Sequence, residues 1–343
     1  MAFPNICCTE CKYRKSNRLE FYTQNADGLS LQHSKAIYGK VTMLQKLRPA
    51  LSRTDHLFIG TDRFMYFTLS WDAEQKQLRT EKTFESVADN AARESQTGER
   101  CHVDPSGRFM TLEVYEGIIT IIPLVQRGKK RKQEPDIAHL GEPVPSRVSE
   151  MFVRSSTFLR PRNFDDKPKL ALLYEDTHSL VKLKLRELSF ASDNSVDLDE
   201  GESYRGELEL GSSHLIPIEE PTYGLIIIGE TSIGYYNDET GDLLTEPLDE
   251  ATIFVAWARV DAQRFVLADD YGRLYLFMLV LDNRNKVQTW KLDVIGKTSR
   301  ASVSKLQSIS HNSAPLLRFL FMPLRVYLIA SILRADKLWR RIL

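Results

Sequence analysis

Short apolar runs separated by turn residues dominate the hydrophobic pattern of this chain. The clearest example is residues 104–124, where Asp104 and Gly107 bracket a tight turn and residues 109–115 alternate with the period of two expected of a strand. Glu116 and Gly117 then reverse the chain, and the β-branched run 118–124 is typical of a buried strand. The pattern predicts a β-hairpin.

The same arrangement recurs along the chain, with almost no helical periodicity up to about residue 300. Residues 56–67, 225–236 and 266–276 each read as an apolar strand, a turn with Gly or Asp, and a second apolar strand. The predicted strands, some of them within these hairpins, include residues 57–61, 64–71, 170–174, 181–188, 225–229, 265–268 and 274–281. About twenty strands, or roughly five four-stranded blades, suit a propeller, but periodicity alone also allows a sandwich.

Several stretches resemble the N-terminal part of one family, the large triple-β-propeller adaptors. The hairpin 104–124 carries the likeness, and further matching blocks follow the family's order: Asn17-Arg-Leu-Glu-Phe-Tyr22, Ala36-Ile-Tyr-Gly-Lys-Val41, Leu47-Arg-Pro49, Tyr223-Gly-Leu-Ile-Ile-Ile-Gly229, Ser232-Ile-Gly-Tyr-Tyr-Asn237 and Gly272-Arg-Leu-Tyr-Leu-Phe-Met-Leu279. Members include the large subunits of the damaged-DNA-binding protein, of splicing factor 3b and of the cleavage and polyadenylation specificity factor. The resemblance implies an all-β fold, an incomplete first β-propeller with about five of seven four-stranded blades.

The resemblance to the damaged-DNA-binding subunit also implies a function. It implies a scaffold without enzymatic activity, the adaptor of a cullin-RING E3 ubiquitin ligase that recruits propeller-type substrate receptors in DNA-damage repair. In that family the first and third propellers form the receptor cleft and the second docks the cullin, so the part represented here lacks the cullin contact. Tyr38, Gly39 and Lys40, together with Glu116 and Gly117, lie at turns in matching blocks and are the interface candidates.

Charge and cysteine content bear on nucleic-acid binding and on cellular location. Lys and Arg number 46 and Asp and Glu 46, so there is no overall basic footprint, and we expect DNA contact to be indirect or weak and strongly salt-dependent. Four cysteines do not form a disulfide framework, and the first twenty residues lack the apolar core of a signal peptide. We expect a protein of the nucleus, and the same features are compatible with the cytoplasm. We expect it to bind no cofactor and to make no contact with a membrane.

Three local patterns invite a chemical interpretation. Cys8 and Cys11, with Cys7 beside them, have the spacing of a zinc clamp but no second ligand pair nearby. The acidic stretch 193–202 lacks the ligand order of a calcium loop. The basic run consists of Arg127, Lys129, Lys130, Arg131 and Lys132 in a predicted loop, where nuclear import competes with an ordinary solvated loop.

No motif for catalysis is present. The chain has no Walker loop, no His-Glu-x-x-His and no Gly-x-Ser-x-Gly, and its seven histidines are scattered. The aromatic residues of the strands are interpreted as core rather than as a base-stacking platform: Phe64, Tyr66, Trp71, Tyr235, Tyr236, Trp257, Tyr275 and Phe277. A scaffold of an RNA-processing complex is the alternative function, and a propeller enzyme is a further one.

Both ends depart from the family pattern. We divide the chain into an atypical N-terminal segment, residues 1–16, a partial propeller, residues 17–300, and a divergent basic and apolar tail, residues 301–343. Arg318, Pro323 and Arg325 argue against a membrane-spanning helix within the apolar part of the tail. A surface helix and an artefact of the gene model both stay open for it.

Overall fold

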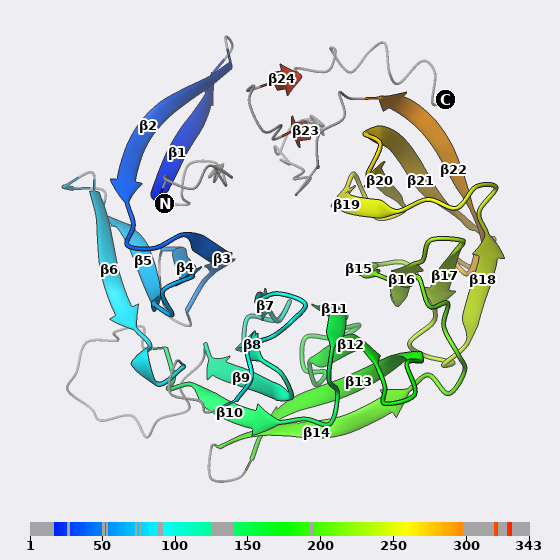
Figure 1. Cartoon of the computed structure of the whole chain (residues 1–343), viewed down its shortest axis with the longest axis horizontal. Helices are drawn as coiled ribbons and strands as arrows, with labels where there is room; N and C mark the ends of the chain where they lie inside the picture. The colour runs from blue at the N-terminus through cyan, green and yellow to red at the C-terminus, as the bar shows by residue number, and fades with distance from the viewer. Residues whose placement is uncertain are drawn as a thin grey trace. The chain divides into compact units, whose positions relative to one another are not determined.

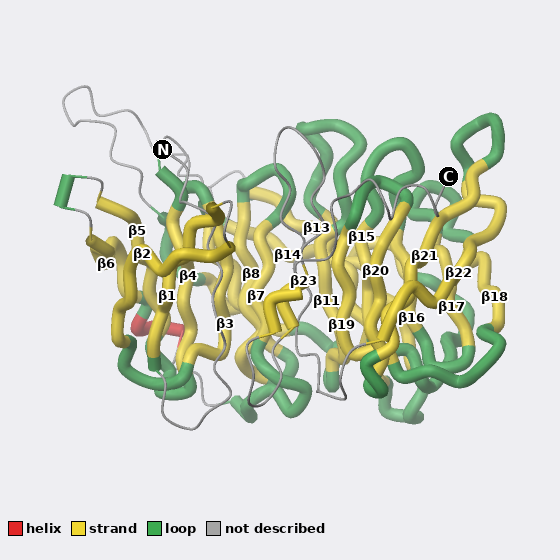
Figure 2. Tube along the Cα trace, turned by 90° about the horizontal axis from the view of Figure 1, so that it is seen from above, coloured by secondary structure: helices red, strands yellow, loops and turns green. Residues whose placement is uncertain are grey.

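The computed structural model describes residues 17–25, 28–49, 52, 54–72, 74–75, 77–87, 92–124, 140–191, 195–297, 319–321 and 328–330. These residues are almost entirely strands and the loops between them (Figure 2), with one 3-10 turn at Glu85–Val87. They fall into two compact units, the first ending at Pro217 and the second beginning at Ile218.

The first unit contains three four-stranded sheets, each built from strands that follow one another in chain order and pair antiparallel (Figure 1). A two-stranded sheet, β1–β2, precedes them. The strands are β1 (Arg18–Asn25), β2 (Gly28–Ala36), β3 (Val41–Leu47), β4 (His56–Thr61), β5 (Tyr66–Asp72), β6 (Gln77–Thr83), β7 (Arg100–Val103), β8 (Phe109–Tyr115), β9 (Ile118–Pro123), β10 (Val144–Arg147), β11 (Val153–Phe158), β12 (Lys169–Glu175), β13 (Val181–Phe190), β14 (Val196–Ser203) and β15 (His214–Pro217).

The remaining strands are β16 (Leu225–Ile228), β17 (Ser232–Tyr236), β18 (Leu243–Pro247), β19 (Phe254–Arg259), β20 (Arg264–Asp269), β21 (Arg273–Leu281), β22 (Val287–Lys297), β23 (Phe319–Phe321) and β24 (Leu328–Ala330). They complete the sheets β15–β16–β17–β18 and β19–β20–β21–β22, and β23 pairs with β24. Four antiparallel strands in chain order are the makeup of a propeller blade. With five such sheets in the described part of the chain, the predicted all-β propeller fold with about five blades is confirmed.

The hairpin predicted around Asp104 forms as expected. The Asp104 carboxylate accepts hydrogen bonds from the backbone N–H of Ser106 (3.0 Å) and of Arg108 (2.9 Å), and Gly107 supplies the left-handed conformation with φ of 70°. Strand β8 has the predicted bounds, and β9 ends at Pro123, one residue before the predicted end.

In the first unit the core lies between sheets, because both faces of a strand are apolar where two sheets flank it. Phe58 of β4 joins Met110 of β8 in one cluster, and Ile121 of β9 joins Leu172 of β12 in the next. Phe21 of β1 packs in a third cluster with the other face of the β3–β6 sheet. Stacked sheets leave turns, edges and strand ends as the accessible surface.

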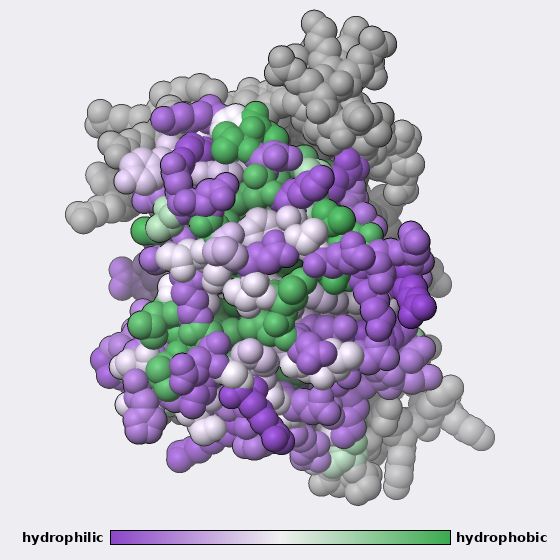
Figure 3. Space-filling model, turned by 90° about the vertical axis from the view of Figure 1, so that its right-hand side faces the viewer, coloured by the Kyte–Doolittle hydropathy of each residue, from purple (hydrophilic) through white to green (hydrophobic). Residues whose placement is uncertain are grey.

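In the second unit the aromatic residues of β21 and β22 pack toward β17. The rings of Phe277 and Trp290 lie 5.5 Å apart between centroids, and Trp290 Nε1 donates to the Ile233 carbonyl at 3.3 Å. The opposite face of the β19–β22 sheet is a cluster of small and aliphatic side chains that includes Ala258 and Val266. Figure 3 views the side of the molecule on which β18 and β22 lie in Figure 1, where hydrophobic residues gather in bands between hydrophilic ones.

The predicted aromatic core is confirmed except at its first member. Tyr66, Tyr235, Tyr236, Tyr275 and Phe277 are buried, and Trp71 and Trp257 are half-buried. Phe64 is 38% exposed, so its assignment to the core was wrong. Strand β5 begins only at Tyr66, and Phe64 belongs to the preceding turn, with φ of 55°.

Several sequence features lie outside the described residues. These are the segment 1–16 with Cys7, Cys8 and Cys11, and the basic run Arg127 to Lys132. Asp193 also lies outside, whereas the acidic residues 197–202 belong to β14. Of the tail 301–343, only β23 and β24 are described. The proposed domain limits therefore stay predictions.

Candidate protein-interaction surface

Each four-stranded sheet of the first unit has one end at which the chain enters its first strand and at which its second strand turns into its third. Because each connector links this end of one sheet to the same end of the next, these loops share one side of the first unit. We call this side the connector end. Its described segments are residues 37–40, 62–65, 84–87, 92–99, 116–117, 148–152, 176–180 and 204–213.

Exposed apolar side chains of the first unit gather at the connector end. Among the described residues of that unit, eight large hydrophobic residues are exposed, and six of them lie there: Tyr38, Phe64, Met65, Met151, Phe152 and Leu210. The other two are Leu31 in β2 and Phe164 between β11 and β12. Because Phe64 and Phe152 also adopt positive φ values of 55° and 49°, two aromatic rings are held at this end in a conformation that bulky residues rarely adopt.

Three of the sequence candidates lie together at this end. Tyr38 is 77% exposed, and Lys40 is exposed beside it. Gly39 has φ of 92°, and a Cβ there would lie 2.8 Å from Arg63 Cγ and 2.9 Å from Asp62 Oδ1. Gly39 therefore allows two neighbouring loops to approach closely, and Tyr38 and Lys40 remain interface candidates.

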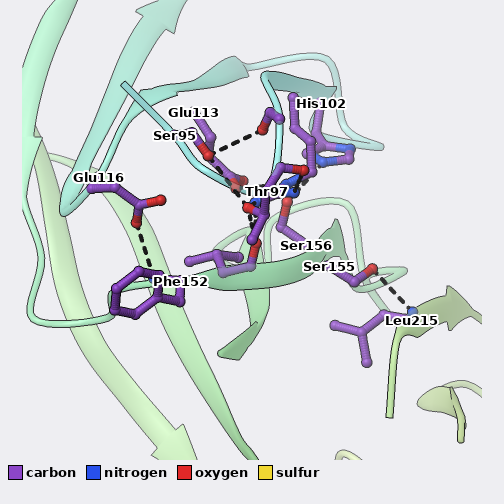
Figure 4. A network of polar contacts seen from close by, with 12 residues as sticks. Ser95, Thr97, His102, Glu113, Glu116, Phe152, Ser155, Ser156 and Leu215 are labelled. Carbon is purple, nitrogen blue, oxygen red and sulfur yellow. Dashed lines mark hydrogen bonds and ion pairs between the residues drawn. The ribbon is translucent and has the colours of Figure 1, made fainter. Parts of the chain in front are cut away.

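Of the other two candidates, Glu116 is buried and Gly117 is half-buried. The buried Glu116 carboxylate accepts the backbone N–H of Gln96 at 2.8 Å. It also accepts the backbone N–H of Phe152 at 2.9 Å (Figure 4). Gly117, with φ of 68°, accepts the N–H of Val148 at 2.9 Å. Both residues tie the β10–β11 connector to the β8–β9 turn, and a role in an interface stays a prediction for them.

A second set of polar contacts joins β7 to the start of β11. Arg100 Nε lies 3.0 Å from the Glu113 carboxylate, and its Nη2 donates to the Thr97 hydroxyl at 3.1 Å and to the Val153 carbonyl. The Thr97 hydroxyl also donates to the Val153 carbonyl at 2.5 Å. Deeper along the same two strands, His102 Nε2 hydrogen-bonds the Ser156 hydroxyl at 2.9 Å (Figure 4). The loops at this end are thus fixed by side chains.

A buried ion pair between Glu150 and Arg186 anchors the β10–β11 connector to strand β13. Glu150, 1% exposed, accepts hydrogen bonds from Arg186 Nη2 of β13 at both carboxylate oxygens, at 2.9 and 2.7 Å, and a longer one from the Ser149 hydroxyl at 3.4 Å. The next two residues, Met151 and Phe152, are exposed. A charged anchor in the interior therefore positions the apolar pair at the surface.

Burial and local ion pairing shift the pKa values of two carboxyl groups at the connector end, those of Glu99 and Asp176. Burial raises the pKa of the Glu99 carboxyl, against hydrogen bonds from the Thr42 and Tyr66 hydroxyls that lower it. A hydrogen bond from Lys182 lowers the pKa of Asp176 to about 2, and that aspartate also accepts the backbone N–H of Leu180. At neutral pH the Asp176 carboxylate is therefore ionised, and the Lys182 ammonium group balances its charge.

Comparison with known proteins decides the family. The sequence model of the RSE1/DDB1/CPSF1 first beta-propeller matches residues 11–306. The chain belongs to this family. The match covers most of the chain and includes all five four-stranded sheets.

Individual relatives of the family give the same answer. The chain is 30% identical over 290 residues to DNA damage-binding protein 1b of Arabidopsis thaliana and 31% identical over 290 residues to DNA damage-binding protein 1 of Oryza sativa subsp. japonica. It is 29% identical over 294 residues to DNA damage-binding protein 1 of Schizosaccharomyces pombe. Each alignment covers 84% of this chain but only 25–26% of the relative, so the chain spans about a quarter of their length.

Sequence reasoning missed Phe64, Met65, Met151 and Phe152 as surface residues. An apolar pair beside a strand is normally read as part of the strand, and here the turn extends through it. A signal was present for the first pair, because Thr61 and Asp62 are residues that favour a turn. No comparable local signal marks the second pair.

Other chemistry finds little support in the described part of the chain. There, no group of three or more His, Cys, Asp or Glu side chains is arranged to hold a metal ion. Cys101 lies half-buried on β7. A search of the same residues for a helix long and apolar enough to cross a membrane finds none.

Proposed function

We propose that this chain is a protein-interaction scaffold, the receptor-binding propeller of a nuclear adaptor of a cullin-RING E3 ubiquitin ligase that acts in DNA-damage repair. Membership of the first-propeller family and relatives named DNA damage-binding protein 1 support the proposal. The observation that carries it is the set of exposed large apolar side chains at the connector end, because exposed apolar residues that gather on one side of a protein mark contact sites. The proposed activity is binding, with no catalytic step.

The proposed partners are propeller-type substrate receptors. The family resemblance assigns the cullin contact to a second propeller, so we assign the receptor contact to the propeller described here. We propose that DNA is reached through the receptor, with any direct affinity weak and falling steeply with salt, since the chain has balanced charge. We also propose that the protein acts in the nucleus, and this function is compatible with a presence in the cytoplasm.

The test is affinity purification of the tagged chain from cells of its own source, followed by mass spectrometry. Propeller-type receptors are expected among the partners. They should be lost from a variant with Tyr38→Ala, Phe64→Ala and Phe152→Ala, and retained by the matched control Phe164→Ala, whose ring is 73% exposed outside the connector end. Splicing or polyadenylation factors in place of receptors would favour the alternative function, a scaffold of an RNA-processing complex.

A further inference from the structure

Two loops at the start of the first four-stranded sheet form one compact surface. The backbone N–H of Lys40 donates to Asp62 Oδ1 at 2.6 Å, and the N–H of Asp62 donates to the Lys40 carbonyl at 2.9 Å. Gly39 lets the Arg63 side chain approach the first loop. Tyr38, Lys40, Arg63, Phe64 and Met65 therefore share one patch, which we call the Tyr38 patch.

The apolar part of this patch is preorganised. Thr61, fully buried, accepts the backbone N–H of Phe64 at its carbonyl (3.0 Å) and the N–H of Met65 at its hydroxyl (3.3 Å). These bonds hold Phe64 at φ of 55° with its ring exposed, beside an exposed Met65. A surface fixed before binding loses less conformational entropy on association than a flexible one. Tyr38 adds the most exposed large hydrophobic side chain of the described residues.

Two cations flank the apolar residues. Lys40 and Arg63 are exposed, and neither side chain forms an ion pair with another described residue. The corresponding turn of the last four-stranded sheet differs, because Arg273 lies over the Tyr271 ring and pairs with Asp269 at 2.6 Å and Glu250 at 3.4 Å. At the Tyr38 patch the positive charge is left available.

The acidic groups nearest the patch are already engaged. Asp62 Oδ1 accepts the Lys40 N–H. Glu99 is half-buried, and its carboxylate accepts hydrogen bonds from Thr42 and Tyr66. The exposed charges of the patch are therefore two cations and Asp62, which has one oxygen occupied by the Lys40 N–H, and this excess of positive charge favours an anionic partner.

We propose that the Tyr38 patch binds an acidic peptide segment that carries an apolar side chain. The apolar side chain packs against Tyr38, Phe64 and Met65, and the acidic side chains on either side of it pair with Lys40 and Arg63. This inference rests on the proposed scaffold function and names the chemistry of the partner at that site. Because the charge pairs are exposed, affinity falls as ionic strength rises.

The test is fluorescence anisotropy with a short labelled peptide in which Asp and Glu flank one Leu and one Phe. Tyr38→Ala is expected to weaken binding about tenfold, as for a central aromatic anchor. The double variant Lys40→Glu with Arg63→Glu is expected to weaken it by about tenfold or more. Phe164→Ala and Lys291→Glu are matched controls, an exposed ring and an exposed cation away from the patch, and should leave affinity unchanged.

Three results would overturn the proposal: no measurable binding of this peptide by the wild-type chain, equal binding of a peptide with Lys in place of every acid, or equal binding by the double charge variant. Displacement of the peptide by a single-stranded oligonucleotide would assign the patch to nucleic acid instead and also overturn it. Circular dichroism of each variant establishes that it is folded.

The two proposals can fail separately. Receptor capture that survives the double charge variant, with peptide binding unaffected by it, rejects the acidic-peptide inference and leaves the scaffold function standing. Peptide binding that depends on the patch, without receptors among the partners of the wild-type chain, rejects the receptor assignment and leaves the patch standing.

Discussion

Replacing Glu150 by Gln should destabilise the chain more than any exposed charge change. Arg186 is 5% exposed and would lose the carboxylate to which its Nη2 donates twice. Removing one partner of a buried pair costs about 3–5 kcal/mol, because the other charge is left without compensation. Glu200 Oε1 lies 3.7 Å from Arg186 Nη2 and can recover part of this, so we expect about 3 kcal/mol.

Thermal unfolding followed by circular dichroism measures the effect. For a unit of this size, 3 kcal/mol corresponds to a fall in Tm of roughly 6–12 °C. Glu200→Gln is the matched control, since it makes the same chemical change at a partner that is 67% exposed, and it should cost less than about 1 kcal/mol. Combining Glu150→Leu with Arg186→Met should restore most of the stability, because no buried charge remains.

Equal losses for Glu150→Gln and Glu200→Gln would refute this reasoning. That result would mean that burial does not decide the strength of the pair. Failure of the apolar double variant to recover stability, with the single losses as expected, would instead show that the pair sets the geometry of the β10–β11 connector and that apolar packing does not replace it.

Three further predictions test the anchoring of the strands and loops. Gly39→Ala should cost about 1–3 kcal/mol in thermal unfolding, because the residue is at φ of 92° and its Cβ would meet neighbouring side chains at under 3.0 Å; an unchanged Tm would contradict this. Glu116→Gln should cost about 2 kcal/mol and speed amide exchange in the β10–β11 connector, because one of its two backbone donors loses its acceptor; exchange as slow as in the wild type would count against it. For Asp55, burial alone would raise the pKa, but ion-pair hydrogen bonds from Lys46 and Arg48 outweigh it and leave the pKa below its usual value. A lowered folded-state pKa stabilises above the unfolded value of about 3.9, so the Tm difference between wild type and Asp55→Asn should be present at pH 7 and shrink as the pH falls below about 4; a difference independent of pH would reject this linkage.

The strands could be predicted because their signals are local. Side chains of the two faces alternate along residues 109–115, the full length of β8. The turn before β8 is formed by the Asp104 side chain, which accepts a backbone N–H of the turn, and by the positive φ of Gly107. The aromatic residues inside strands, such as Tyr66 and Phe277, were placed in the core for the same reason. The alternation of apolar and polar residues and the choice of turn residues both depend only on neighbouring residues, so both can be seen in the sequence.

The surface could not be predicted in the same way, because it depends on contacts between distant residues. Glu116 has a residue type suited to an exposed turn, yet its carboxylate is buried by bonding the backbone of Phe152, 36 positions later. Phe64 looks like a strand residue, but its backbone N–H donates to the Thr61 carbonyl and it adopts the left-handed conformation of a turn. Gly39 was singled out correctly as a turn residue, but the reason for it, the approach of Arg63, is again non-local.

Where partners can bind follows from how the sheets are stacked. In the first unit both faces of the β7–β10 sheet are buried against neighbouring sheets, so its strands offer recognition only at edges and ends. The strand residues therefore determine the fold, and the connectors carry the exposed apolar side chains. The β10–β11 connector is held by charged groups beneath it, Glu116 and the pair of Glu150 with Arg186. This division predicts that substitutions of exposed connector residues change partner affinity at nearly constant Tm, whereas substitutions of the charged anchors change both.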